Sequence, residues 1–151
     1  MRTVVLVEGL SDQVALESLA TRQGRNFAAE GVAIVPMGGA TNIRRYLNRF
    51  GPRESNSKLA VLCDANEARG IRRSLEWAGD ACSDRGSVDL YVCVADLEDE
   101  LIRAIGAESV EQVVDAQGEL AMFRTLQRQP AQQGRAIEAQ LRRFMGTKSG
   151  R

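Results

Sequence analysis

Short apolar runs alternate with stretches of helical periodicity over the first two thirds of the chain. Each run is bounded by turn residues and rich in β-branched side chains, which is typical of a buried parallel strand. The runs predict strands at residues 3–7, 32–36, 59–63 and 88–94. The stretches between them predict helices over about residues 11–22, 40–50 and 70–77. This alternation predicts parallel strands joined by right-handed crossovers.

Beyond residue 95 the pattern becomes purely helical. Apolar residues at helical spacing predict four helices, over about residues 97–105, 110–114, 120–126 and 137–145. The sequence therefore predicts an α/β fold, with a four-stranded, mainly parallel sheet, flanking helices and a C-terminal helical appendage. We expect the sheet and the helices that follow it to occupy residues 1–118. A basic helical segment at 119–151 is expected to belong to the same single domain.

The composition excludes several classes of site. The chain has no histidine, which excludes His-based triads, histidine general bases and zinc sites that need imidazole. Its three cysteines show no CxxC spacing, which favours buried, reduced thiols and a cytoplasmic setting. No apolar stretch approaches the roughly 20 residues needed to cross a bilayer, so we expect no membrane association.

The net charge is zero but unevenly spread. Residues 1–119 carry 13 basic and 19 acidic side chains, whereas residues 120–151 carry seven basic ones and only Glu138. A basic tail on an acidic body suits a protein that processes nucleic acid, and an amphipathic helix packed on that body is the alternative. The candidates for phosphate contacts are Arg124, Arg128, Arg135, Arg142 and Arg143.

Two acidic residues follow directly after predicted strands. Glu8 ends the first strand and Asp64 follows the third, so both are expected at the carboxyl edge of the sheet, where α/β proteins bind ligands. Asp12 opens the helix after the first strand, although the helix dipole alone would favour an acid there. Converging carboxylates are costly unless a cation neutralises them, and Mg²⁺ prefers such oxygen ligands together with phosphates. Phosphoryl chemistry is therefore predicted.

Other polar residues follow the remaining strands. Gly38-Gly39 could let backbone amides approach a phosphate, or could form only a tight turn. Asn66 lies two positions after Asp64 and could reach the same cation. The acidic run after the fourth strand would bring Asp96 or Glu98 to the same sheet edge, although most such clusters are solvated helix starts.

Together these motifs resemble the Toprim domain, the metal-binding module of topoisomerases, bacterial primases and OLD-family nucleases. The resemblance covers roughly residues 3–95, in a Rossmann-like arrangement. It rests on Glu8-Gly9 closing the first strand, Gly38-Gly39 following the second and Asp64-Ala65-Asn66 following the third. With the acidic run Asp96–Leu101, the chain is most similar to the OLD-nuclease branch.

OLD nucleases pair a Toprim domain with an ABC-type ATPase and cleave DNA with divalent metals. The resemblance thus implies a bacterial nuclease that uses Mg²⁺ or Mn²⁺, with DNA favoured over RNA as substrate. It implies that Lys148 completes the catalytic site with Glu8 and Asp64. The implied metal ligands are Glu8, Asp12, Asp64, Asn66 and Glu98.

This sequence departs from the family pattern in two ways. Asn66 stands where the family's DxD motif has its second aspartate. Its amide oxygen can ligate a metal but brings no charge, so the metal could shift to Glu67. The chain also has no ATPase, so it either acts alone or works with a separate ATPase partner. A homodimer is left open.

Two alternatives remain. A weakened Toprim module could bind nucleic acid or a partner protein in a regulatory role, which Asn66 favours. A phospho-acceptor domain with Asp64 as acceptor would need a lysine after a late strand, whereas Lys58 precedes the third strand.

Overall fold

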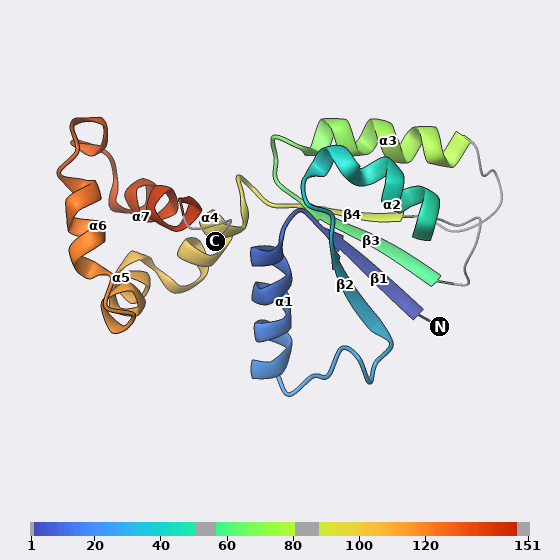
Figure 1. Ribbon diagram of the computed structural model, residues 1–151, viewed down its shortest axis with the longest axis horizontal. Helices are drawn as coiled ribbons and strands as arrows, with labels where there is room; N and C mark the ends of the chain where they lie inside the picture. The colour runs from blue at the N-terminus through green and yellow to red at the C-terminus, as the bar shows by residue number, and fades with distance from the viewer. Residues whose placement is uncertain (1, 51–56, 81–87, 148–151) are drawn as a thin grey trace. The chain divides into compact units, whose positions relative to one another are not determined.

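Four parallel strands and the helices between them form the N-terminal part of the chain (Figure 1). The computed structural model describes residues 2–50, 57–80 and 88–147. The strand order is β2-β1-β3-β4, and each neighbouring pair is parallel, which confirms the predicted fold class. The elements are β1 (Arg2–Val7), α1 (Leu10–Arg22), β2 (Val32–Pro36), a 3₁₀ turn η1 (Ala40–Asn42), α2 (Ile43–Phe50), β3 (Ser57–Cys63), α3 (Ala68–Asp80) and β4 (Val88–Val92).

One face of the sheet packs against α2 and α3. In the register of β1 and β3, Leu6 pairs with Val61, and neither side chain has measurable exposure. Side chains two positions apart on a strand share a face, so β1 and β3 present alternate apolar residues to the helices. The buried residues of this core are Val4, Leu6, Met37, Ala40, Ile43, Leu47, Leu59, Val61, Cys63, Ala68 and Ile71.

The helix α1 covers the other face and contacts β2 and β1 (Figure 1). Only Ala20 of α1 is buried, while Leu10, Val14 and Leu19 are more than half exposed. The chain therefore leaves β1 towards one face and leaves β3 towards the other. Since β1 and β3 are neighbours, their carboxyl ends form the topological switch point, the position at which open α/β sheets bind ligands.

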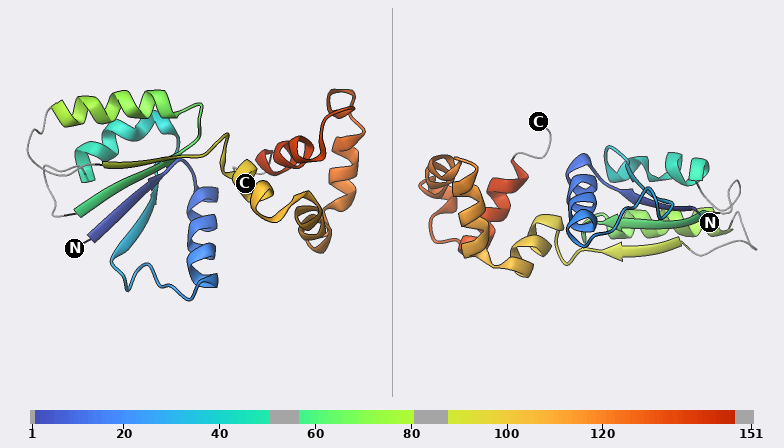
Figure 2. Two further views of the ribbon diagram at one scale, coloured as in Figure 1. Left: turned by 180° about the vertical axis from the view of Figure 1, so that it is seen from behind. Right: turned by 90° about the horizontal axis from the view of Figure 1, so that it is seen from below.

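The remaining helices form a second compact unit. The chain divides into the units Met1–Cys93 and Val94–Arg151. The predicted division at residue 118 was drawn from charge and stays a prediction. The helices of the second unit follow one another around their own core in both views of Figure 2. They are α4 (Leu97–Ile105), α5 (Ala107–Ala116), α6 (Leu120–Gln127), a 3₁₀ turn η2 (Pro130–Gln132) and α7 (Ile137–Gly146).

The core of the second unit is built around Phe123, which is fully buried and lies against Phe144 with ring centroids 5.3 Å apart. A buried amide network joins the helices around it. The Nε2 group of Gln127 donates to Oε1 of Gln140, and Nε2 of Gln140 donates to the carbonyl of Gln132, both at 2.8 Å. These bonds fix α6, η2 and α7 together, because buried amides are costly without partners.

Two local expectations from the sequence need correction. The fourth strand ends at Val92, where the N–H of Cys93 makes a closing bond of 2.9 Å to the carbonyl of Cys63. The third helix is longer than predicted, spanning Ala68–Asp80. The N-cap of α1 is Gly9. Within the described ranges, no helix has the length and apolar character to span a membrane.

Candidate metal and nucleic-acid site

Glu8 lies one residue beyond β1, beside the turn that follows β2. The N–H of Met37 donates to the carbonyl of Val7, and the N–H of Gly39 donates to the carbonyl of Glu8 at 3.0 Å. Gly38 and Gly39 have φ of +70° and +116°, values that favour glycine. The glycine turn is therefore next to Glu8, as predicted, but the amide of Gly39 is already used by the protein backbone. Whether either glycine contacts a phosphate stays a prediction.

Asp12 caps its own helix. Its Oδ2 accepts a hydrogen bond of 2.7 Å from the N–H of Gly9 at the start of α1. This is the structural role that a carboxylate in the first helical turn often has. The bond holds the Asp12 carboxylate at Gly9, the residue next to Glu8. Asp12 can therefore cap the helix and still be a candidate metal ligand.

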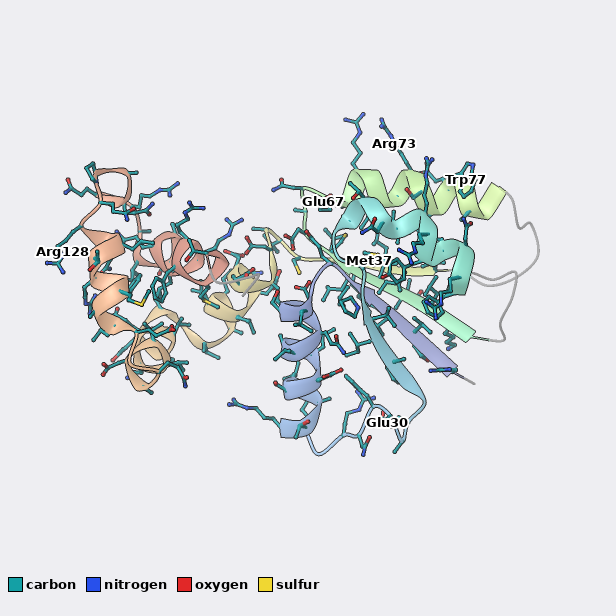
Figure 3. The ribbon with its side chains drawn as sticks, viewed as in Figure 1. Glu30, Met37, Glu67, Arg73, Trp77 and Arg128 are labelled. Carbon is teal, nitrogen blue, oxygen red and sulfur yellow. The ribbon has the colours of Figure 1, made fainter. Side chains whose placement is uncertain are left out.

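Asp64 and Glu67 lie on the turn between β3 and α3. The carbonyl of Asp64 accepts the N–H groups of Glu67 and Ala68, both at 3.1 Å, so the chain enters α3 directly after the acid. Glu67 is partly buried, whereas Asn66 is exposed. Figure 3 shows Glu67 at the beginning of α3, near the carboxyl ends of the strands. Glu67, to which the sequence analysis allowed the metal to shift, thus follows Asp64 directly before α3, and its part in metal binding stays a prediction.

The pKa of the Cys63 thiol depends on the charged groups around it. Burial and, to a smaller extent, the negative charge of Asp64 raise the pKa of Cys63 to about 11, with smaller contributions from Glu67 and Glu8. Arg72 acts in the opposite direction. The three carboxylates and Arg72 thus act on the thiol at the end of β3 through their charges. Whether the carboxylates converge on one cation stays a prediction.

Glu8, Asp64 and Glu67 do not form a coordination sphere in this structure. Among residues 2–50, 57–80 and 88–147, no group of three or more acidic or thiol side chains is close enough to hold a metal ion together. The side chains of Glu8, Asp64 and Glu67 offer only oxygen donors, which fits a hard cation such as Mg²⁺ or Mn²⁺.

The acidic run after β4 is occupied within its own unit. Asp96 caps α4, its Oδ1 accepting from the N–H of Asp99 at 2.9 Å, while its Oδ2 pairs with Nε of Arg142 at 2.5 Å. Asp99 and Glu100 both pair with Arg103. The expectation that most such clusters are helix starts therefore fits Asp96.

Glu98 lies in the first turn of α4, and its predicted part in a second metal site stays a prediction.

Two of the arginines predicted to contact nucleic acid are bound to acids. Arg142 pairs with Asp96, and Arg124 forms an ion pair with Glu111. Arg128 and Arg143 are exposed, with Nε of Arg128 donating to the carbonyl of Arg124. Lys148, the remaining predicted catalytic residue, lies outside the described residues.

A groove of about 930 Å³ lies on the other side of the first unit. It is lined by residues of α1, of the segment 25–28 and of the beginning of β2, including Arg2 and Val32. These residues lie at the amino ends of the strands, opposite the edge that carries Glu8 and Asp64. The groove therefore has no part in the acidic site.

Comparison with known proteins agrees with this geometry. The family model described as "Overcoming lysogenization defect protein-like, TOPRIM domain" matches residues 1–65, which include the first three strands and end just after Asp64. Residues 1–65 are therefore similar to an OLD-like Toprim domain. The predicted resemblance is thus confirmed, and Toprim domains generally bind divalent metals and act on nucleic acid.

Solved structures show the same fold over nearly the whole chain. The C-terminal region of the Xanthomonas campestris pv. campestris OLD protein, phased with iodine, is similar with a TM-score of 0.64 and 22% identity, over 96% of this chain and 80% of that one. The C-terminal region of the Burkholderia pseudomallei OLD protein gives 0.60 and 20%, over 95% and 87%. No curated protein sequence matches the chain. The folds of the sheet unit and of the helical unit after it thus both have counterparts in the C-terminal regions of OLD proteins.

Proposed function

We propose that this protein cleaves phosphodiester bonds in nucleic acid with the aid of Mg²⁺ or Mn²⁺. The observation that carries the proposal is the position of Glu8 directly after β1 and of Asp64 and Glu67 directly after β3, at the switch point of an OLD-like Toprim fold. Acidic residues at this position, in a family that acts on nucleic acid, support phosphoryl transfer over other reactions.

Glu8 and Asp64 would hold the ion, with Glu67 or Asp12 as a further carboxylate. When bound, the ion would neutralise charge that develops on the phosphate. The Asp12 carboxylate is oriented by its bond to the N–H of Gly9. In a single-metal form Glu8 would instead take the proton from the attacking water while Asp64 holds the ion.

The partners follow from the same resemblance. We propose DNA as the substrate in preference to RNA, and a separate ATPase as a partner, because OLD nucleases combine the two activities. The action of Lys148 and a second ion at Glu98 belong to this proposal too. A bacterial cytoplasmic location fits buried thiols, and Cys63 and Cys93 are both buried.

The direct test is incubation of supercoiled plasmid with the full chain and Mg²⁺, Mn²⁺ or EDTA. We expect nicking or linearisation with the ions and none with EDTA. Asp64→Asn should reduce the rate by about a thousandfold, near the upper end of what one electrostatic contact to the reacting group contributes. The matched control is Asp89→Asn, since Asp89 is an exposed acid on β4 of the same unit. Equal cleavage by both variants would contradict the proposal.

A second candidate function is a regulatory module with a weakened metal site. Asn66 favours it, because an amide at this exposed position adds no charge to the cluster. Asn66→Asp separates the two functions, since a carboxylate should tighten Mg²⁺ binding. If only Asn66→Asp cleaves plasmid, the natural chain is the regulatory form.

A further inference from the structure

The helices α2 and α3 carry an unusual excess of arginine. Together they hold six arginines against two acids, Glu76 and Asp80. Their buried positions, such as Ile43, Leu47 and Ile71, face the sheet, so the arginines occupy the solvent side of the layer. The arginines are Arg44, Arg45, Arg49, Arg69, Arg72 and Arg73.

Part of this arginine excess forms a continuous face with an aromatic centre. Arg69, Arg73 and Trp77 follow one another at intervals of four residues, which places them along one side of α3. Trp77 is 50% exposed, and the guanidinium of Arg44 on α2 lies 5.4 Å from the centre of its ring. In Figure 3 the side chains of Arg73 and Trp77 extend from α3 away from the sheet. We call Arg44, Arg45, Arg69, Arg73 and Trp77 the arginine–tryptophan face.

The charges of this face differ from those of the second unit in their pairing. In the part of the chain that the structure describes, none of its four arginines forms an ion pair, whereas Arg103, Arg124 and Arg142 of the second unit all do. Guanidinium groups without an acidic partner, beside a half-exposed indole, combine the two requirements for binding a single strand. The cations bind phosphates, and the ring stacks on a base.

The face also leads to the acidic site. Arg69 lies in the first turn of α3, two residues after Glu67, and the stripe continues along α3 towards Trp77. A strand with a phosphate at the carboxyl edge of the sheet could therefore continue over α3. We infer that the arginine–tryptophan face binds a single-stranded segment of nucleic acid, with a base stacked on Trp77 and phosphates on Arg44, Arg69 and Arg73. This inference rests on the proposed function for the identity of the ligand.

The chain provides its own probe, because Trp77 is its single tryptophan. Titration of the full chain in EDTA with a thymidine oligonucleotide of about 20 nucleotides, longer than the site of a typical single-strand-binding fold, should quench the tryptophan fluorescence to saturation. The affinity of labelled oligonucleotide, measured by anisotropy, should fall at least about fivefold in Trp77→Ala, since one stacked base contributes at least about 1 kcal/mol. Trp77→Phe should retain most of it.

The arginines are tested by salt dependence. The double variant Arg44→Ala/Arg73→Ala should lower the slope of log affinity against log salt by about 1.4, since each phosphate that is no longer neutralised on a single strand lowers it by about 0.7. The matched control is Arg22→Ala, an exposed arginine in the last turn of α1 on the other face of the sheet, which should leave the slope unchanged. Circular dichroism verifies that each variant folds.

Three results would overturn the inference. The first is saturable oligonucleotide binding without change in the tryptophan fluorescence. The second is equal quenching by duplex DNA, whose bases are not free to stack, and the third is equal quenching by polyglutamate. Because these titrations contain no metal, they are independent of cleavage. If the chain cleaves plasmid but shows no quenching, the proposed function stands and this binding site is rejected. If the chain shows quenching but does not cleave plasmid, the binding site stands and the proposed function is rejected.

Discussion

The two units of the protein contain nearly the same charges but arrange them differently. Residues 1–93 hold 12 basic and 11 acidic side chains, and residues 94–151 hold eight and nine. In the second unit several charges are paired across helices, as in Arg142–Asp96 and Arg124–Glu111, although Arg128 and Arg143 are exposed. The first unit has the pair Arg25–Glu30, but its acids after β1 and β3 and the arginines on the outer side of α2 and α3 lie in separate places.

The difference indicates where each unit uses its charge. A paired charge mainly fixes one helix to another, and it is satisfied without a ligand. A cluster of one sign is unfavourable in the isolated protein and gains free energy when an oppositely charged ligand binds. We therefore expect changes to acids and arginines to alter ligand binding in the first unit and stability in the second.

The largest effect is expected for the metal affinity of the first unit. Each of the variants Glu8→Gln and Asp64→Asn removes one negative charge from a site that already has Asn66 in place of an acid. The Mn²⁺ affinity should therefore fall at least about a hundredfold, which is the scale of losing a strong electrostatic contact. Calorimetric titration measures it, with Glu76→Gln on α3 as the control. Undiminished Mn²⁺ affinity in both site variants would remove the assignment of the cation site.

Next in size is the stability of the second unit. Asp96→Ala removes the cap of α4 and the partner of Arg142, which should cost about 1–3 kcal/mol in the free energy of unfolding. Urea denaturation measures the change, and Asp115→Ala, at the exposed end of α5, should cost nothing. Mn²⁺ binding should be unaffected, and a Mn²⁺ affinity lowered by Asp96→Ala would contradict a purely structural role for Asp96.

A smaller effect concerns pH. The pKa of Cys63 rises from its ordinary value of 9.0 to about 11, because the thiol is buried and lies beside Asp64. The unfolded chain therefore loses this proton first, so the contribution to stability is complete below pH 9 and is lost as the pH rises towards 11. Urea unfolding across this range should show the loss, and Cys63→Ala should remove that part of it. Mn²⁺ should lower the pKa of Cys63 by neutralising the nearby carboxylates, and an unchanged value would place the ion elsewhere.

The smallest effect is expected for Arg124→Ala. The pair with Glu111 is largely exposed, so its loss should cost only about 0.2–1 kcal/mol in unfolding free energy. Oligonucleotide affinity, measured by anisotropy beside Arg73→Ala, should stay near that of the unchanged chain. A larger loss of affinity in Arg124→Ala than in Arg73→Ala would restore the C-terminal arginines as the phosphate contacts and reverse the comparison.

The sequence alone was sufficient for the fold of both units. An apolar run such as residues 4–7 is removed from water when both faces of the sheet are covered. Apolar residues at helical spacing, such as Phe123, are buried when their helices pack around a common core. Glu8 and Asp64 could also be predicted at one sheet edge, because each directly follows such a run and parallel strands bring their carboxyl ends together.

Only the tertiary structure decided which charges are free. Residues 120–151 read as a basic tail, yet Arg142 finds Asp96, which lies 46 positions earlier in the chain. The same packing gives Glu67 a place beside Asp64 and leaves Arg44, Arg73 and Trp77 uncovered on α2 and α3. Charge pairing depends on distances of a few ångströms between residues far apart in sequence, so the folded chain decides whether an arginine meets an acid or is left for a phosphate.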